Sequence, residues 1–171
     1  MEFENDNLIN FTSKSWSHHL DVNLKAPAYL TKEFAKNTRG KNNNIINIID
    51  QRVFKLTPFF FSYTLSKTAL YTLTKTSAMS LSPEIRVNGI APGAIETPST
   101  AFITQNKAMH EATVRWIPQG RLGKPDDIAL AALYLASSAG GFVSGKIIEV
   151  DGGMAALPGM AIEARIARPD D

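Results

Sequence analysis

The sequence contains no cysteine, which excludes disulfides, thiolate nucleophiles and cysteine-based metal sites. It lacks an apolar run long enough to span a bilayer, and it begins with an acidic, polar segment unlike a signal peptide. The net charge is also small. The 171 residues carry a formal net charge of +2, and lysine and arginine form no run. That balance argues against nucleic acid as a partner. These absences predict a cytoplasmic protein that binds no membrane, nucleic acid or metal.

Apolar residues make up 44% and charged residues 20% of the chain, an ordinary balance for one globular domain with a hydrophobic core. Periodicity predicts helices over 13–38, 62–82, 101–116 and 126–138, and short apolar runs predict strands over 45–49, 85–91 and 146–150. This order predicts an α/β fold in which helices cover a parallel sheet. Ligands bind such sheets beyond the carboxyl ends of the strands, where Asp50, Pro92 and Gly93 fall.

Tyr63 and Lys67 stand four residues apart within one predicted helix. Residues at this spacing share a helix face, so the phenol and the ammonium can point at one spot. A lysine cation beside a phenol is expected to lower the tyrosine pKa. A tyrosine tuned in this way can give a proton to a carbonyl or imine that is being reduced. The pair also arises by chance on amphipathic helices, so its meaning depends on the surrounding motifs.

Those motifs resemble the C-terminal part of a short-chain dehydrogenase/reductase. Tyr63 and Lys67 match the catalytic pair of that family, and Asn23 matches the helix asparagine of its catalytic tetrad. The segment 86–93 matches the strand and Pro-Gly loop beside the nicotinamide, and 121–125 and 151–153 match two later motifs. The resemblance implies a partial Rossmann-like, doubly wound parallel sheet of about three strands with flanking helices over 1–153. Residues 154–171 form a tail without a counterpart in the family.

The resemblance also implies a nicotinamide cofactor, NADPH or NADH, and a homodimer or homotetramer. The residues that it places at the cofactor are Tyr63, Lys67, Pro92, Gly93, Ile95 and Thr97. The catalytic set that it implies is Asn23, Asp50, Tyr63 and Lys67.

One departure from the family narrows the expected substrate. The family usually has a serine thirteen residues before the tyrosine, and this chain has Asp50 there. An aspartate at this position resembles the pteridine reductases and dihydromonapterin reductases, in which it acts with the tyrosine and lysine in proton delivery to a pterin nitrogen. Phe3 falls near the aromatic residue that stacks on the pterin in that group. The resemblance therefore predicts an NADPH-dependent reductase of a small pterin-like molecule, with Phe3, Asp50 and Tyr63 at the substrate.

A second departure concerns the cofactor site. The family begins with a strand and a Gly-rich turn that hold the cofactor pyrophosphate, and this sequence has neither. The expectation is either a fragment of a longer protein or the product of a decayed gene. Strand 45–49 would then lose its inner neighbour and present an unpaired apolar edge. Two other functions stay open: a non-catalytic remnant that keeps the family's oligomerisation surfaces, and a carbonyl or ketoacyl reductase with an unusual Asp50.

Several of these residues also have a simpler structural interpretation. Asp50 can cap the loop after its strand, Asn23 can serve as a helix-packing amide, and Thr97 can cap the helix that follows it. His18 and His19 lie on a predicted helix without an evident partner, so a solvated surface is expected for both. The aromatic run 59–61 is expected in the core or at a subunit interface.

Overall fold

The computed structural model describes residues 5–40 and 42–156, and a three-stranded parallel sheet lies at its centre. The strands are β1 (Asn43–Ile48), β2 (Ile85–Pro92) and β3 (Ile147–Val150), in the order β1-β2-β3. Asn43 pairs with Ile85 and Gly89 with Ile147, so all three carboxyl ends reach one rim. The predicted α/β fold with a parallel sheet is confirmed.

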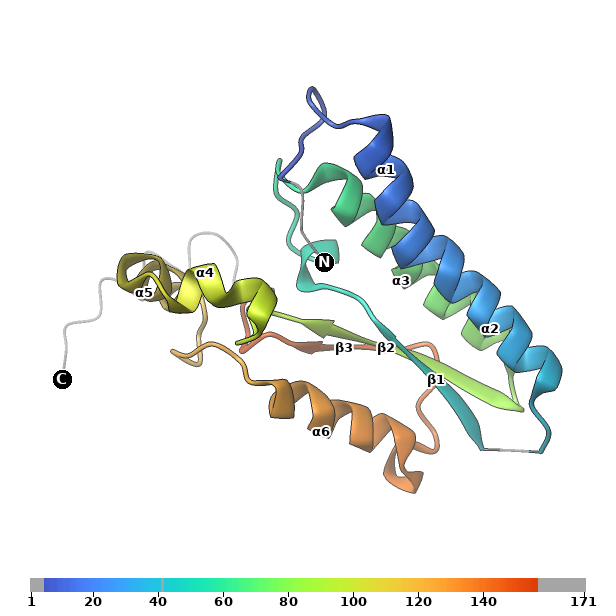
Figure 1. The fold of residues 1–171 in the computed structure, drawn as a ribbon. Coiled ribbons are helices and arrows are strands. Elements are labelled where there is room, and N and C mark those ends of the chain that lie inside the picture. The colour runs from blue at the N-terminus through green and yellow to red at the C-terminus, as the bar shows by residue number, and fades with distance from the viewer. Residues whose placement is uncertain (1–4, 41, 157–171) are drawn as a thin grey trace.

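Helices cover both faces of this sheet (Figure 1). One face carries α1 (Ser13–Leu20), α2 (Ala26–Asn37) and α3 (Phe61–Leu81), and the other carries α6 (Pro125–Ala136). The short helices α4 (Ala101–Thr104) and α5 (Lys107–Arg115) lie beyond the carboxyl ends of the strands. The carboxyl ends of the strands and the start of α3 therefore border the region where the sequence predicts the site.

The segment predicted as one helix over 13–38 is interrupted by a π-helical stretch, Asp21–Lys25, between α1 and α2. Pro27 explains the interruption, because proline has no N–H for the carbonyl of Asn23 and its ring crowds that carbonyl. A π-helical turn widens the backbone and lets the chain pass the proline without breaking. The Ala26 N–H still finds the Asp21 carbonyl within this turn.

The longest helix, α3, packs on the sheet through two small apolar clusters. Leu70 joins Ile49 and Ala91 in one of them, and Ala78 joins Ile85 and Val87 in the other. Because a buried leucine contributes transfer and packing energy, Leu70→Ala would cost about 2 to 5 kcal/mol of stability. This packing fixes α3 relative to the strand ends.

The single helix predicted over 101–116 is two helices, α4 and α5. Asn106 separates them, because its side chain accepts the Met109 N–H at 3.1 Å and so starts a new helix. Among the described residues, no helix is both long and apolar enough to cross a membrane.

β1 forms one edge of the sheet, as predicted for this strand. Beside it, an open and mostly apolar groove of about 380 Å³ runs between β1 and α2. Leu30, Phe34 and Ile45 are among the side chains that line it, and Leu30 is 71% exposed. Ile48 is also exposed, at the end of β1.

Candidate active site

Asp50 and Tyr63 meet at the carboxyl-end rim of the sheet. Asp50 stands two residues beyond β1, and Tyr63 lies in the first turn of α3. The Tyr63 hydroxyl donates a hydrogen bond to Asp50 Oδ2 at 3.0 Å. The other carboxylate oxygen, Oδ1, accepts the Arg52 N–H at 2.8 Å, so Asp50 also caps the short helix Gln51–Val53. Loop capping, the simpler interpretation of Asp50, is therefore present beside the contact with Tyr63, and the proton-relay role stays a prediction.

Burial and the neighbouring carboxylate control the acidity of Tyr63. The side chain is 4% exposed. Burial raises the pKa of Tyr63 far above its usual range, and the negative charge and hydrogen bond of Asp50 raise it further. The lowered pKa expected from the sequence is therefore wrong. Tyr63 holds its proton at neutral pH, as a general acid must before it acts.

Lys67 lies one helical turn after Tyr63 and on the same side of α3. Its Nζ donates to the Ile48 carbonyl at 2.9 Å and lies 5.7 Å from the centre of the Tyr63 ring. Burial lowers the pKa of Lys67, and the negative charge of Asp50 opposes that shift. The strand end, the phenol and the ammonium are thus held together.

Arg52 completes the surroundings of the carboxylate, and no motif in the sequence singles it out. Its Nη1 lies 3.7 Å from Asp50 Oδ2, and its guanidinium stacks 4.4 Å from the centre of the Phe60 ring. Its positive charge opposes the rise in the pKa of Tyr63. Asp50 is thus held from one side by the phenol and from the other by a cation.

Asn23 reaches Tyr63 indirectly. Its Nδ2 donates to Ser66 Oγ at 3.0 Å, and Ser66 Oγ donates to the Tyr63 backbone carbonyl at 2.7 Å. The side chain is 4% exposed and joins the π-helical stretch to α3. This geometry supports the helix-packing interpretation of Asn23.

The other predicted cofactor residues lie at the end of β2 and in the loop after it, at positions 92, 93, 95 and 97. The Gly93 N–H donates to the Val150 carbonyl at 3.0 Å, and a Cβ there would lie 2.7 Å from the Asp151 Cα. The close approach of two backbones therefore requires glycine at this position, and Pro92 immediately precedes it as the last residue of β2. Ile95 is buried and bridges to Gly123.

Thr97 is exposed on this loop and begins the short helix Pro98–Thr100. Its N–H donates to Thr100 Oγ1 at 2.9 Å, so the capping role considered from the sequence is present. Phe3, the predicted substrate-stacking residue, lies outside the described residues. Across 5–40 and 42–156, no three His, Cys, Asp or Glu side chains are grouped to hold a metal ion.

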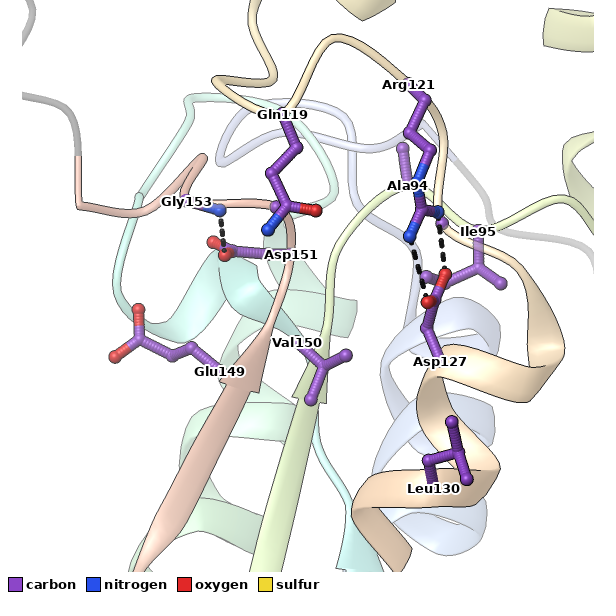
Figure 2. Close-up of a pocket in the computed structure, with 12 residues that line it drawn as sticks. Ala94, Ile95, Gln119, Arg121, Asp127, Leu130, Glu149, Val150, Asp151 and Gly153 are labelled. Atoms are coloured by element: carbon purple, nitrogen blue, oxygen red, sulfur yellow. Dashed lines mark hydrogen bonds and ion pairs between the residues drawn. The ribbon is translucent and has the colours of Figure 1, made fainter.

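A cavity near the rim lies beyond β2 and β3 (Figure 2). It measures about 300 Å³ and shares only Ala94 and Ile95 with the predicted cofactor loop; neither Asp50 nor Tyr63 lines it. Its lining includes a two-point ion pair in which Arg121 Nη1 and Nη2 donate to Asp127 at 2.8 and 3.0 Å. This cavity is separate from the tyrosine site.

His19 was expected on a solvated surface, and this expectation is wrong. His19 is 1% exposed, and its Nδ1 lies 2.7 Å from Ser62 Oγ. The reason is that α1 and the π-helical stretch pack against α3 through a polar stripe in which Ser15, His19 and Asn23 are all buried. Their spacing of four residues could have revealed this face, but a search for apolar periodicity overlooks it. His18 is exposed, as expected.

The fit of a nicotinamide dinucleotide can be judged from these residues. Tyr63, Lys67, Thr97 and the Pro92–Gly93 loop lie at one rim, where the family resemblance predicts the nicotinamide and its ribose. The described residues include no Gly-rich turn between a strand and a helix that would hold the pyrophosphate. The chain therefore fits one end of the cofactor.

Comparison with known proteins gives a consistent set of relatives. The sequence profile of the family described as Enoyl-(Acyl carrier protein) reductase matches residues 2–155. The chain is 38% identical over 149 residues to the 2-dehydro-3-deoxy-D-gluconate 5-dehydrogenase of Bacillus subtilis. It is 36% identical over 149 residues to the 3-oxoacyl-(acyl-carrier-protein) reductase FabG of Thermotoga maritima. These alignments cover 84% and 86% of the chain, and 58% and 60% of the two proteins.

A solved structure gives a similar result. FolM alternative dihydrofolate reductase 1 of Brucella canis, solved in complex with NADP, superposes with a TM-score of 0.79 at 35% identity. The match covers 92% of this chain and 60% of that one. Across the leading curated relatives, the chain spans only 53% to 60% of their length.

Proposed function

The chain belongs to the short-chain dehydrogenase/reductase family, and we propose that it contributes the catalytic residues of an NADPH-dependent reductase acting on a pterin-like C=N bond. The observation that carries this proposal is the 3.0 Å hydrogen bond from the Tyr63 hydroxyl to Asp50. It joins a buried, protonated phenol to a carboxylate at the rim where ligands bind parallel sheets.

The carboxylate favours a nitrogen heterocycle over a simple carbonyl. Asp50 can only accept hydrogen bonds when ionised, so it attracts ring N–H and amino groups and repels a carbonyl oxygen. A serine at this position would offer a hydroxyl donor to a carbonyl. The FolM structure, whose name describes an alternative dihydrofolate reductase, adds support from a relative that aligns with most of this chain.

In the proposed reaction, each residue has a role that its position supports. A nicotinamide held at this rim would supply the hydride for the carbon of the C=N bond. Tyr63 gives its hydroxyl proton to the nitrogen, and Asp50 returns a proton to Tyr63 from solvent. Asp50 suits this relay because its side chain is 17% exposed while Tyr63 is 4% exposed. Lys67 places a positive charge beside the phenolate that forms.

We assign only the nicotinamide end of the cofactor to this chain, with Tyr63, Lys67, Pro92, Gly93, Ile95 and Thr97 around it. The relatives are longer than this chain, which covers 58% and 60% of two of them. A pyrophosphate-binding α/β segment would add at the open edge of β1. The exposed Leu30 and Ile48 beside that edge are available for its packing. We further propose a homodimer or homotetramer, the arrangement implied by the family resemblance.

The test compares two substrates in the wild type and in Asp50→Ser. With NADPH in excess, dihydrobiopterin should be reduced and an acetoacetyl thioester should not. Asp50→Ser should lower dihydrobiopterin reduction on the order of 100-fold, because the proton relay and the N–H acceptor are both lost. A wild type that prefers the thioester would contradict the pterin assignment.

The second candidate is a carbonyl reductase, and the 36% identity to the Thermotoga 3-oxoacyl reductase favours it. In that case Asp50→Ser should leave thioester reduction unchanged or raise it, because serine is the residue suited to a carbonyl oxygen. Fluorescence titration with NADPH separates both enzymes from a non-catalytic remnant. Absence of saturable binding up to millimolar NADPH would contradict both enzyme assignments for this chain alone.

A further inference from the structure

A buried polar network lies beside Tyr63 and has no part in the proposed chemistry. Asp6, His19 and Ser62 form it, and they are 5%, 1% and 1% exposed. The three come from the segment before α1, from α1 and from the first turn of α3. Burying three polar side chains is costly unless each is hydrogen-bonded, so their mutual contacts must be specific.

The hydrogen bonds of the network have a definite direction. Ser62 Oγ donates its only proton to Asp6 Oδ2. The Ser62 oxygen can therefore only accept from His19 Nδ1, which lies 2.7 Å away. This direction requires a proton on Nδ1 of His19. The network thus runs from the imidazole through the hydroxyl to the carboxylate.

Asp6 also replaces the missing cap of α3. The residue before the helix, Phe60, has a left-handed backbone with φ of 57° and offers no side-chain cap. Instead, the Phe61 N–H donates to the Asp6 carbonyl at 3.2 Å, and the Ser62 N–H donates to Asp6 Oδ1 at 3.3 Å. The carboxylate at the positive end of the helix dipole adds a favourable charge interaction. The start of α3 is therefore fixed by a residue more than fifty positions earlier.

His19 touches Tyr63 directly. The two rings meet edge to face, with centres 5.7 Å apart and planes at 76°. Tyr63 follows Ser62 in the chain, so the same imidazole holds the phenol ring and, through Ser62, the backbone that carries it. On its other side the phenol meets Asp50. Movement of the network would change the 3.0 Å contact between the phenol and the carboxylate.

We propose that Asp6, Ser62 and His19 form a positioning unit that holds the Tyr63 phenol against Asp50, with His19 in the Nδ1–H form. The catalytic consequence rests on the proposed function, whereas the structural role does not. Small displacements of a reacting group are costly to rate, since a shift of about 1 Å can cost on the order of 100-fold. Loss of the His19 hydrogen bond should therefore lower kcat while leaving NADPH affinity unchanged.

The experiment separates the hydrogen bond of His19 from its bulk. His19→Asn keeps an N–H donor near Ser62, and His19→Phe keeps the ring but removes the donor. The exposed neighbour His18 supplies the matched controls His18→Asn and His18→Phe. The full chain is labelled with 3-fluorotyrosine, and its ¹⁹F spectrum reports on Tyr63, whose signal is assigned by its loss in Tyr63→Phe. Nitrogen NMR of the histidine side chains reports which ring nitrogen of His19 carries the proton.

The proposal expects Nδ1–H at His19 and a displaced Tyr63 fluorine signal in His19→Phe. The signal should stay near the wild-type position in His19→Asn and in both His18 variants. In the reductase assay, kcat should fall on the order of 10-fold in His19→Phe and recover to within about 3-fold in His19→Asn. Equal effects of the two His19 variants, or a proton on Nε2 alone, would overturn the unit.

Ser62 provides a second and independent pair of variants. Ser62→Ala removes the hydroxyl that joins His19 to Asp6, and Ser62→Thr retains one. The Tyr63 signal should move in the first variant and not in the second, and the reverse order would also overturn the unit. If no form of the chain reduces a pterin, the proposed function fails, and the fluorine and nitrogen spectra still decide the positioning unit.

Discussion

Two aspartates at the same rim of the sheet have opposite surroundings. Asp50 faces a buried phenol, and the contact raises the pKa of Tyr63. Asp127 faces an exposed guanidinium in a two-point ion pair, and Arg121 lowers the pKa of that carboxyl. Arg121 and Asp127 line the cavity of about 300 Å³ beyond β2 and β3, whereas Asp50 and Tyr63 do not. A cavity alone therefore does not mark the candidate site, because catalytic groups commonly have pKa values perturbed by burial and by a charged partner.

Removal of the phenol should have the largest effect. Tyr63→Phe deletes the proposed proton donor and keeps the ring, so kcat should fall about 10²- to 10⁴-fold. Steady-state reduction of dihydrobiopterin measures the loss, and circular dichroism checks the fold. Tyr71→Phe, on the same helix, is the matched control and should retain activity. Equal activity in wild type and Tyr63→Phe would show that Tyr63 is not the proton donor and that Asp50 does not act through it.

The loop after β2 should be sensitive to one added methyl group at Gly93. Gly93→Ala places a Cβ 2.7 Å from the Asp151 Cα, a backbone atom that cannot yield as the end of a flexible side chain does. We expect a loss of about 3 kcal/mol in urea unfolding. Gly40→Ala, with open space but φ of 82°, should cost about 1 kcal/mol. A smaller loss for Gly93→Ala than for Gly40→Ala would show that the loop moves freely.

The raised pKa of Tyr63 makes stability depend on alkaline pH. Above the unfolded value of about 10, the phenol is deprotonated in the unfolded chain and still protonated in the folded one. The folded state then binds more protons, so this contribution is complete below pH 10 and is lost as pH rises, by about 1.4 kcal/mol per unit. Urea unfolding from about pH 9 to 11 should show the loss in wild type relative to Tyr63→Phe. Parallel pH profiles for the two would contradict the raised value.

Loss of the exposed ion pair between Arg121 and Asp127 should have the smallest effect on activity and stability. Arg121→Ala removes an ion pair that water already screens, so kcat should change by less than about 2-fold. The melting temperature should change by no more than a few degrees, and by less in 1 M salt, where screening is stronger. A larger loss of activity than in Asp50→Ser would reverse the comparison between the two aspartates.

The sequence predicted the parts of this site that depend on local pattern. The three strands and the helix that carries Tyr63 follow from apolar runs and periodicity, and they place Asp50 and Tyr63 on one rim. The thirteen-residue separation of the pair matches a direct hydrogen bond. The family resemblance is supported by the profile match over most of the chain.

Features that depend on tertiary burial could not be predicted in the same way. The direction of the pKa shift of Tyr63 follows from desolvation, which no spacing of residues reveals. His19 is polar and lies on a helix, so only the packing of α1 against α3 shows that it is buried. The aromatic run also divides: Phe59 is exposed, Phe60 stacks with Arg52, and Phe61 packs near Phe11.

The π-helical stretch has a consequence for the rotational phase of the first helix. Each residue of an α-helix turns the chain by about 100°, so an extra residue within one turn offsets everything before it by that angle. Deleting one residue within 21–25 would rotate Ser15 and His19 away from α3 and turn a solvated face toward it. The extra residue in the π-helical stretch therefore sets which face of α1 packs against α3.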